Sequence, residues 1–290
     1  MAQRYARRQL GDRADGRKLR TLPSVERLAP YIRRTRVDAE EHYRESIEVS
    51  ALSGWLSGKT HEGLRSMELV HVVAAAFVRT VAYCPYFNRF IAGSRIFARN
   101  DVSVSLLGIG ETATGQIKAE LSPSDTVSDV YHRILEQTER LKAGDADSAA
   151  ERAAGFLMLL PRFLLRFGVQ FVRLGDYYGI WGHRLLSASN SHCSVRIFDN
   201  ARSSLGANSM PLQNFGNNSV NITLGKIRTV LEPDESGKLI VRRWLDIDIA
   251  VDCRIAPKAD IERAVAYWKH FMENPRELER APKRILDDVN

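Results

Sequence analysis

Several features that would fix a class of function are scarce or missing from this sequence of 290 residues. It has three cysteines, Cys84, Cys193 and Cys253, and no cysteine or histidine cluster with metal-ligand spacing. A small, odd number of cysteines is typical of a reduced, cytoplasmic protein. No apolar run reaches the roughly 18 residues that a bilayer-spanning helix needs. We therefore expect a reduced protein with neither a metal centre nor a transmembrane segment.

Motifs for phosphate binding and for export are also missing. Gly108-Ile109-Gly110 is too short to form a glycine-rich loop that cradles a phosphate. The N-terminal stretch is polar and lacks the apolar centre of a secretory signal peptide. Apolar residues make up 44% of the chain, which is enough for a substantial core. The composition therefore predicts a globular protein of ordinary type.

The net charge of +7 is concentrated near the N-terminus. Residues 1–36 hold eleven lysines and arginines against three acidic residues, so the rest of the chain is close to neutral. We interpret residues 1–10 as a disordered basic tail, and the remaining arm as solvated or packed on a neighbouring subunit. A basic arm can also contact nucleic acid, but no aromatic interleaving or nucleic-acid motif accompanies it. We do not expect nucleic acid as a partner.

The clearest pattern lies near the C-terminus. Residues 245–251 alternate between apolar and polar side chains, which predicts a strand with one buried face. A turn with Pro257 follows, and apolar residues then recur at helical spacing over 261–272 until Pro275 ends the helix.

The same reasoning predicts elements along the rest of the chain. His71 lies beside the apolar stripe of the first long helix, and we interpret it as a packed residue and not as a ligand. A loop is expected at 143–150. The expected strands are 43–50, 101–107, 112–121, 194–200, 219–226 and 239–251, and the expected helical regions are 64–84, 126–142 and 151–187, the last interrupted at Pro161.

In this C-terminal stretch, a strand is followed by a loop headed by Asp252-Cys253-Arg254 and a helix that ends in Asn274-Pro275. The unit resembles the last unit of the dihydrolipoyl acyltransferase catalytic domain, which shares its fold with chloramphenicol acetyltransferase. Further matches point to a single-domain bacterial branch of that family. They are Asp15-Gly16-Arg17, Pro30-Tyr31-Ile32, Arg36-Val37-Asp38-Ala39 and Asn88-Arg89-Phe90.

This resemblance implies a fold and an assembly. It implies one α/β domain over residues 11–290, with a mixed β-sheet covered by helices in a chloramphenicol-acetyltransferase-like sandwich. It also implies a homotrimer with a channel at each subunit interface, and coenzyme A or carrier-protein thioesters as substrates. No lipoyl domain or linker for one is present, so we expect no lipoyl group. In related proteins an apolar helix like 151–187 packs over the sheet, so we do not expect a membrane as a partner.

The positions that carry the family's chemistry have changed in this chain. The family's general base is a histidine, and Cys253 stands in its place. The family's oxyanion donor is a serine or threonine before an asparagine, and Asp199 stands there before Asn200. A carboxylate would repel a developing oxyanion. Asp252 and Arg254 are retained, and the family uses this pair as a structural brace.

Two candidate catalytic residues therefore remain, Cys253 and Asp199. Cys253 could form an acyl-enzyme if a base or a positive field lowered its pKa, but an inert packed thiol is the simpler interpretation. Asp199 could act as an acid or base in a different reaction. Asn200, Ser219 and His192 are the other polar residues that we expect along the channel.

Three hypotheses about function follow. The first is an acyltransferase-family enzyme that acts on an acyl thioester by non-standard chemistry. The second is a non-catalytic pseudo-acyltransferase that binds a ligand or serves as a scaffold. The third is a repurposed channel that catalyses a different biosynthetic reaction.

Overall fold

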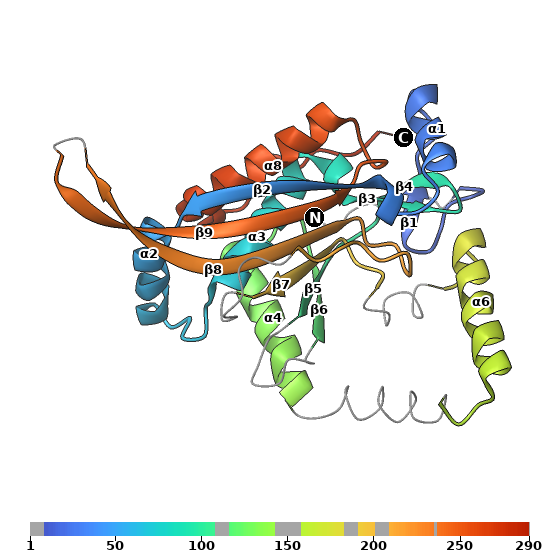
Figure 1. Ribbon diagram of the computed structural model, residues 1–290, viewed down its shortest axis with the longest axis horizontal. Coiled ribbons are helices and arrows are strands. Elements are labelled where there is room, and N and C mark those ends of the chain that lie inside the picture. Colours follow the sequence, from blue (N-terminus) through green and yellow to red (C-terminus); the bar gives the residue numbers. More distant parts are fainter. Residues whose placement is uncertain are drawn as a thin grey trace.

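The computed structural model describes residues 9–107, 116–142, 158–182, 191–200, 209–234 and 237–289 (Figure 1). Two sheets and six helices of the described residues form an α/β architecture. The predicted tail over residues 1–10 and the predicted loop at 143–150 lie almost wholly outside these ranges.

The larger sheet has six strands in the order β2-β9-β8-β7-β5-β6. Its central strands β5, β7 and β8 run parallel to one another, and the outer pairings are antiparallel, so the sheet is mixed. The strands are β2 Glu40–Glu48, β5 Val102–Leu107, β6 Gln116–Leu121, β7 Val195–Asp199, β8 Val220–Pro233 and β9 Leu239–Asp252.

A smaller antiparallel sheet has the order β1-β4-β3. It is made of β1 Gly16–Lys18, β3 Arg89–Ala92 and β4 Arg95–Arg99. A turn at Gly93 and Ser94, both with positive φ, joins β3 to β4. This turn allows the small sheet to contact the C-terminal end of α6, since Gly93 lies against the Tyr177 carbonyl where a larger residue would clash.

The helices differ strongly in how much they are buried. They are α1 Ser24–Ile32, α2 Ser50–His61, α3 Leu69–Tyr83, α4 Val127–Lys142, α6 Arg162–Tyr178 and α8 Lys258–Glu273. Every residue of α3 from Val70 to Ala82 is buried, as expected of a helix that is apolar all round. It packs against α8, where the fully buried Trp268 donates its indole N–H to the Val73 carbonyl at 3.4 Å. These two helices and the sheet share one hydrophobic core.

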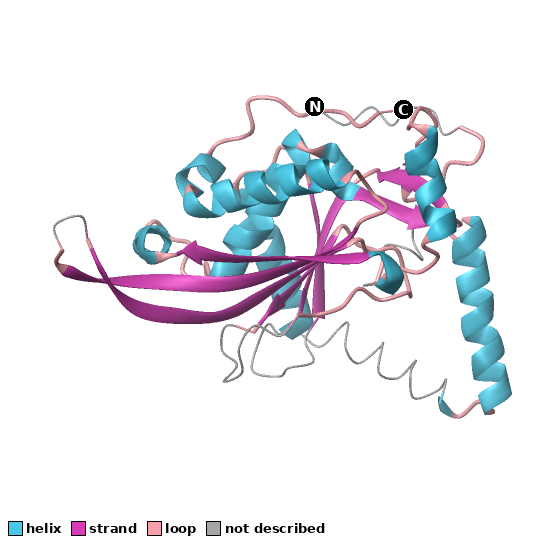
Figure 2. Cartoon of the chain, turned by 45° about the horizontal axis from the view of Figure 1, so that its top comes forward, coloured by secondary structure: helices cyan, strands magenta, loops and turns pink. Residues whose placement is uncertain are grey.

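The C-terminal unit matches its prediction. The predicted strand at 239–251 is β9, and α8 begins directly after Pro257 and ends before Pro275. The alternation continues through β9, with Leu245, Ile247 and Ile249 in the core. β8 and β9 form a long hairpin that extends beyond the rest of the sheet (Figures 1 and 2).

Two predicted elements have shifted ends, and one expectation is wrong. The helix predicted at 64–84 is α3, which begins at Leu69. The strand predicted at 43–50 begins at Glu40 and ends at Glu48, because α2 starts at Ser50. The helical region expected at 151–187 was also predicted to pack over the sheet, and the part of it that the structure describes does not do so. The described part of that region, α6, stands apart from the six-stranded sheet (Figures 1 and 2) and exposes Phe163, Phe167 and Phe171. Its C-terminal end is held by the Arg13–Asp176 ion pair at 2.6 Å and by a contact between Asp176 and His192 at 3.1 Å.

Candidate functional site

The loop after β9 is held by a buried ion pair. Arg254 donates from Nε to Asp252 Oδ1 at 2.8 Å and from Nη2 to Asp252 Oδ2 at 2.7 Å, so the contact is bidentate. The remaining nitrogen, Nη1, donates to the Arg33 carbonyl at 2.8 Å. Both side chains are buried. The pair therefore joins the end of β9 to the segment after α1.

Cys253 lies between these two residues and faces a different environment. Its thiol is half-buried, and the Arg33 guanidinium donates to Sγ at 2.5 Å. Burial raises the pKa of the Cys253 thiol above its usual value, and the nearby Glu41 and Asp252 carboxylates add to this, although Arg33 opposes it. The thiolate is the nucleophile in cysteine chemistry, so a raised pKa leaves Cys253 poorly activated.

Asp199 lies at the end of β7 that is farther from Cys253. It ends β7, where it pairs in register with Leu224 of β8. Ser219, whose carbonyl accepts from the Asp252 amide at 2.9 Å, comes five residues before Leu224. At about 3.3 Å per residue, that is roughly 16 Å along the strand. Within one chain, Cys253 and Asp199 are therefore not brought together.

The other expected channel residues divide between the two ends. Asn200 follows Asp199, and its amide donates to the Leu224 carbonyl at 3.1 Å. Ser219 is buried beside the Asp252 end, and its hydroxyl has no hydrogen-bond partner among the described residues. His192 precedes β7 and therefore also lies at that end, where its Nε2 is 3.1 Å from Asp176 Oδ1 of α6.

Asp176 is the anchor of α6. It contacts both His192 and Arg13, and Arg13 also pairs with Asp15 at 2.9 Å. Burial alone would raise the pKa of Asp176, but the hydrogen bond and charge of His192 and the charge of Arg13 outweigh it and hold the pKa at about 2. The carboxylate is thus ionised at neutral pH and fully engaged.

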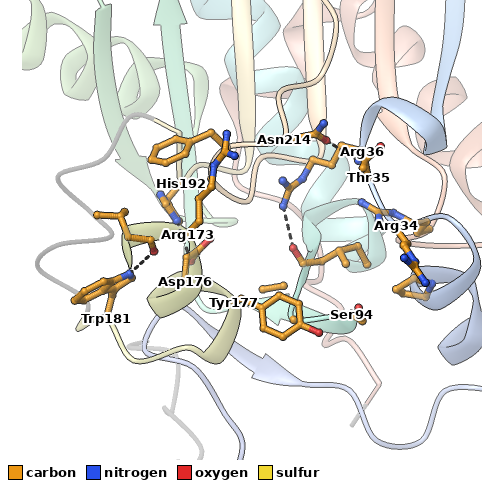
Figure 3. Close-up of a pocket in the computed structure, with 18 residues that line it drawn as sticks. Arg34, Thr35, Arg36, Ser94, Arg173, Asp176, Tyr177, Trp181, His192 and Asn214 are labelled. Carbon is orange, nitrogen blue, oxygen red and sulfur yellow. Dashed lines mark hydrogen bonds and ion pairs between the residues drawn. The ribbon is translucent and has the colours of Figure 1, made fainter. Parts of the chain in front are cut away.

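A cavity of about 510 Å³ opens between α6, the β3–β4 turn, the segment after α1 and the turn at 214–216. Such a volume is in the range of small-molecule sites. Arg254 lines it, so it adjoins the loop after β9. Figure 3 shows Arg173 and Asp176 entering from α6, and Arg34 and Arg36 from the opposite wall.

Sequence reasoning missed a second polar cluster, on the sheet itself. His42 of β2 lies 3.0 Å from Asp248 of β9, and the Ser209 hydroxyl lies 2.9 Å from the same His42 nitrogen and 2.7 Å from Asp248. His42 Nε2 also lies 3.4 Å from Glu40. Since Glu40 pairs in register with Asp252, the cluster begins beside the loop after β9. Strand register brings His42, Asp248 and Glu40 together, Ser209 joins them from outside the strands, and no local motif predicts the cluster.

Among the described residues, no group of three or more histidine, cysteine, aspartate or glutamate side chains is arranged to hold a metal ion. Within the same residues, no helix has the length and apolarity that crossing a bilayer requires.

Comparison with solved structures identifies the fold. No family model matches the chain. No curated protein matches it either. A probable dihydrolipoamide acetyltransferase from Listeria monocytogenes superposes with a TM-score of 0.55 at 10% identity, covering 88% of this chain and 94% of that one. The dihydrolipoamide acetyltransferase of Azotobacter vinelandii superposes with a TM-score of 0.53 at 12% identity, covering 90% and 94%. The cubic core of a pyruvate dehydrogenase multienzyme complex gives 0.52 at 11% identity, with the same coverage. The predicted mixed-sheet α/β architecture is thus confirmed: the chain has the fold of the dihydrolipoamide acetyltransferases.

Proposed function

We propose that this protein binds an acyl thioester, of coenzyme A or of a carrier protein, and does not transfer the acyl group by a histidine-dependent mechanism. The observation that carries this proposal is the loop after β9. Its structural brace, Asp252 and Arg254, is complete, whereas the side chain between them is a thiol held by Arg33.

The proposal follows from what a histidine base requires. An imidazole takes the proton from the attacking thiol or hydroxyl at neutral pH because its pKa lies near 7. A thiol whose pKa is raised carries its proton at that pH and cannot take another. The solved structure from Azotobacter vinelandii was determined to study a serine, a histidine and an asparagine in its catalytic mechanism. By the resemblance of the loop, the histidine position corresponds to Cys253 here.

We also propose that the protein is a homotrimer with its channels between subunits. In one chain, Cys253 and Asp199 lie towards opposite ends of β7, so only a neighbouring copy could bring the two positions together. The exposed apolar side chains of α6 supply a surface that an assembly would bury. The solved structures that share the fold include a multienzyme core.

The test is direct. The natural protein is incubated with acetyl- and octanoyl-coenzyme A, and intact mass, free thiol release and melting temperature are measured. Binding without transfer predicts a rise in melting temperature, no thiol release above the buffer rate and no adduct on Cys253. Turnover that survives in Cys253→Ala would show that an enzyme with another base is at work, and no thermal shift with any thioester would contradict thioester binding.

The His42 cluster favours a second candidate, an acyltransferase with a rebuilt site. His42, Asp248 and Ser209 are mutually within hydrogen-bond distance, and the first two lie on β2 and β9, next to the loop that carries Cys253. In this case His42→Gln would abolish thiol release while Cys253→Ala would not. A third candidate, in which Asp199 serves as the acid or base of a different reaction, predicts that Asp199→Asn alone abolishes turnover. If the natural protein shows no turnover and no thermal shift with any thioester, the scaffold interpretation leads.

A further inference from the structure

Three arginines line the cavity beside α6. Among the described residues, none of the three has a carboxylate within ion-pair distance. Arg34 and Arg36 come from the segment after α1, and Arg173 comes from the side of α6 that faces the cavity (Figure 3). The acid in the lining, Asp176, is already held by Arg13 and His192. Arg254 is neutralised by Asp252. The charge that remains facing the cavity is therefore positive.

Of the three arginines, Arg36 gives the strongest evidence for an anion site, because it is buried. The residue is only 7% exposed, and a buried guanidinium is costly unless its charge is paired. Nη2 donates to the Ile91 carbonyl at 2.9 Å and Nη1 to the Gln213 carbonyl at 3.4 Å, while Nε has no partner among the described residues. Burial lowers the pKa of Arg36 to about 10, and the charges of Asp252 and Asp176 oppose this only in part. The fold thus keeps a buried cation at the cavity wall with donor capacity to spare.

Apolar side chains form a second part of the cavity wall, beside polar ones such as Asn214. Ile91, Val172, Trp181 and Phe215 contribute to it. The Trp181 indole N–H donates to the Val172 carbonyl at 2.8 Å, which holds the ring against the end of α6. Gly175 allows this, because a side chain at that position would clash with the ring. The site therefore combines cationic groups with a preformed apolar surface.

We propose that this cavity binds a small amphipathic anion, a carboxylate or phosphate on an apolar body, with the anionic group held by Arg34, Arg36 and Arg173. Guanidinium groups match the oxygens of both anions, and a charge-assisted hydrogen bond is stronger than a neutral one. The apolar body would lie against Trp181 and Phe215. This site does not depend on whether the loop after β9 handles a thioester.

The test is isothermal titration of the full chain with octanoate and octyl phosphate, each below its aggregation concentration. Octanol and inorganic phosphate are the matched probes for the apolar and the anionic part. We expect octanoate or octyl phosphate to bind at least about tenfold more tightly than octanol or inorganic phosphate binds, because the charged contact and apolar burial act together. Tighter octanoate identifies a carboxylic acid, and tighter octyl phosphate identifies a phosphate ester.

Arg34→Gln and Arg173→Gln carry the mutational test, because both side chains are exposed and their loss leaves the core intact. Each is expected to weaken binding about tenfold or more. Arg166→Gln is the control, since Arg166 is an exposed arginine of the same helix that does not line the cavity. Equal weakening by Arg166→Gln, octanol binding as tight as octanoate, or no binding of either amphiphile by the natural protein would overturn the proposal.

Discussion

Asp252 and Arg254 form a bidentate ion pair that is buried, whereas Asp246 on the same strand forms a bidentate pair with Arg228 that is exposed to solvent. The nitrogen–oxygen distances are similar, 2.8 and 2.7 Å in the first pair and 2.6 and 2.7 Å in the second. The side chains of the first pair are at most 3% exposed, and those of the second are 53% and 33% exposed. Because the two pairs have similar geometry and differ in burial, comparing them shows how burial changes the contribution of an ion pair to the free energy of unfolding.

Asp252→Asn is expected to lower the free energy of unfolding by on the order of 3 kcal/mol, because it leaves a guanidinium buried without its counter-charge. Asp246→Asn is the matched control and should change stability far less, because water solvates Arg228. Urea denaturation of the three proteins at neutral pH measures both. Equal losses in the two variants would mean that burial of the loop pair is not what stabilises it.

Cys253 is expected to react slowly with iodoacetamide at pH 7, because burial raises the pKa of its thiol and little thiolate is present. Its rate should rise as the pH approaches 9 and above. Cys84 and Cys193 are buried, and burial also raises the pKa of each thiol, so labelling of the folded chain should map to Cys253. Peptide mass spectrometry with Cys253→Ala as the blank measures this. Rapid labelling at pH 7 would contradict an unactivated thiol.

His71 is expected to make stability depend on pH between about 4 and 6.5. Burial lowers its pKa from 6.5 to about 4, so the unfolded chain binds the proton more readily than the folded chain. The free energy of unfolding should therefore be highest above pH 6.5 and should fall by about 3 kcal/mol as the pH drops towards 4.

His71→Gln tests that dependence. His71 Nδ1 accepts from the Glu68 amide at 3.0 Å at the start of α3, and glutamine can take over this capping contact without titrating. The variant should lose most of the pH dependence in chemical denaturation between pH 4.5 and 7. His61→Gln is the control, since His61 is exposed at the end of α2. An unchanged slope in His71→Gln would assign the dependence to other groups.

The proposed homotrimer predicts a single species of three chains in sedimentation velocity. Phe167→Glu should shift the population towards smaller species if the outer side of α6 lies in the interface, since Phe167 is 71% exposed in the single chain. Val241→Glu on the projecting β8–β9 hairpin is the matched control, because Val241 is also exposed. A natural protein that sediments as a monomer would exclude channels between subunits.

The elements whose signals are local could be predicted from the residue pattern. The alternation in β9, Pro257 before α8 and Pro275 after it are short-range patterns, and each predicted its element. The loop at Asp252 and Arg254 carried the resemblance to the acyltransferase fold for the same reason. By contrast, α2 was missed because Gly54 and Gly58 weaken its helical pattern and a single residue, Leu52, is buried along it.

The relative positions of the candidate functional residues depend on contacts between distant segments and could not be predicted from the sequence. The offset of roughly 16 Å along β8 between the level of Asp199 and that of Asp252 follows from strand register. Register also brings His42 close to Asp248, which comes 206 residues later in the chain. The position of α6 depends on the ion pair between Asp176 and Arg13. The apolar periodicity of the helix does not predict this contact. In the sequence, Arg36 looks like one more arginine of a basic arm. In the folded chain it is buried at the cavity wall, where it donates to the Ile91 and Gln213 carbonyls. Residue pattern specifies which face of an element is apolar, but the burial of a charge depends on contacts between distant segments, and those contacts exist only in the folded chain.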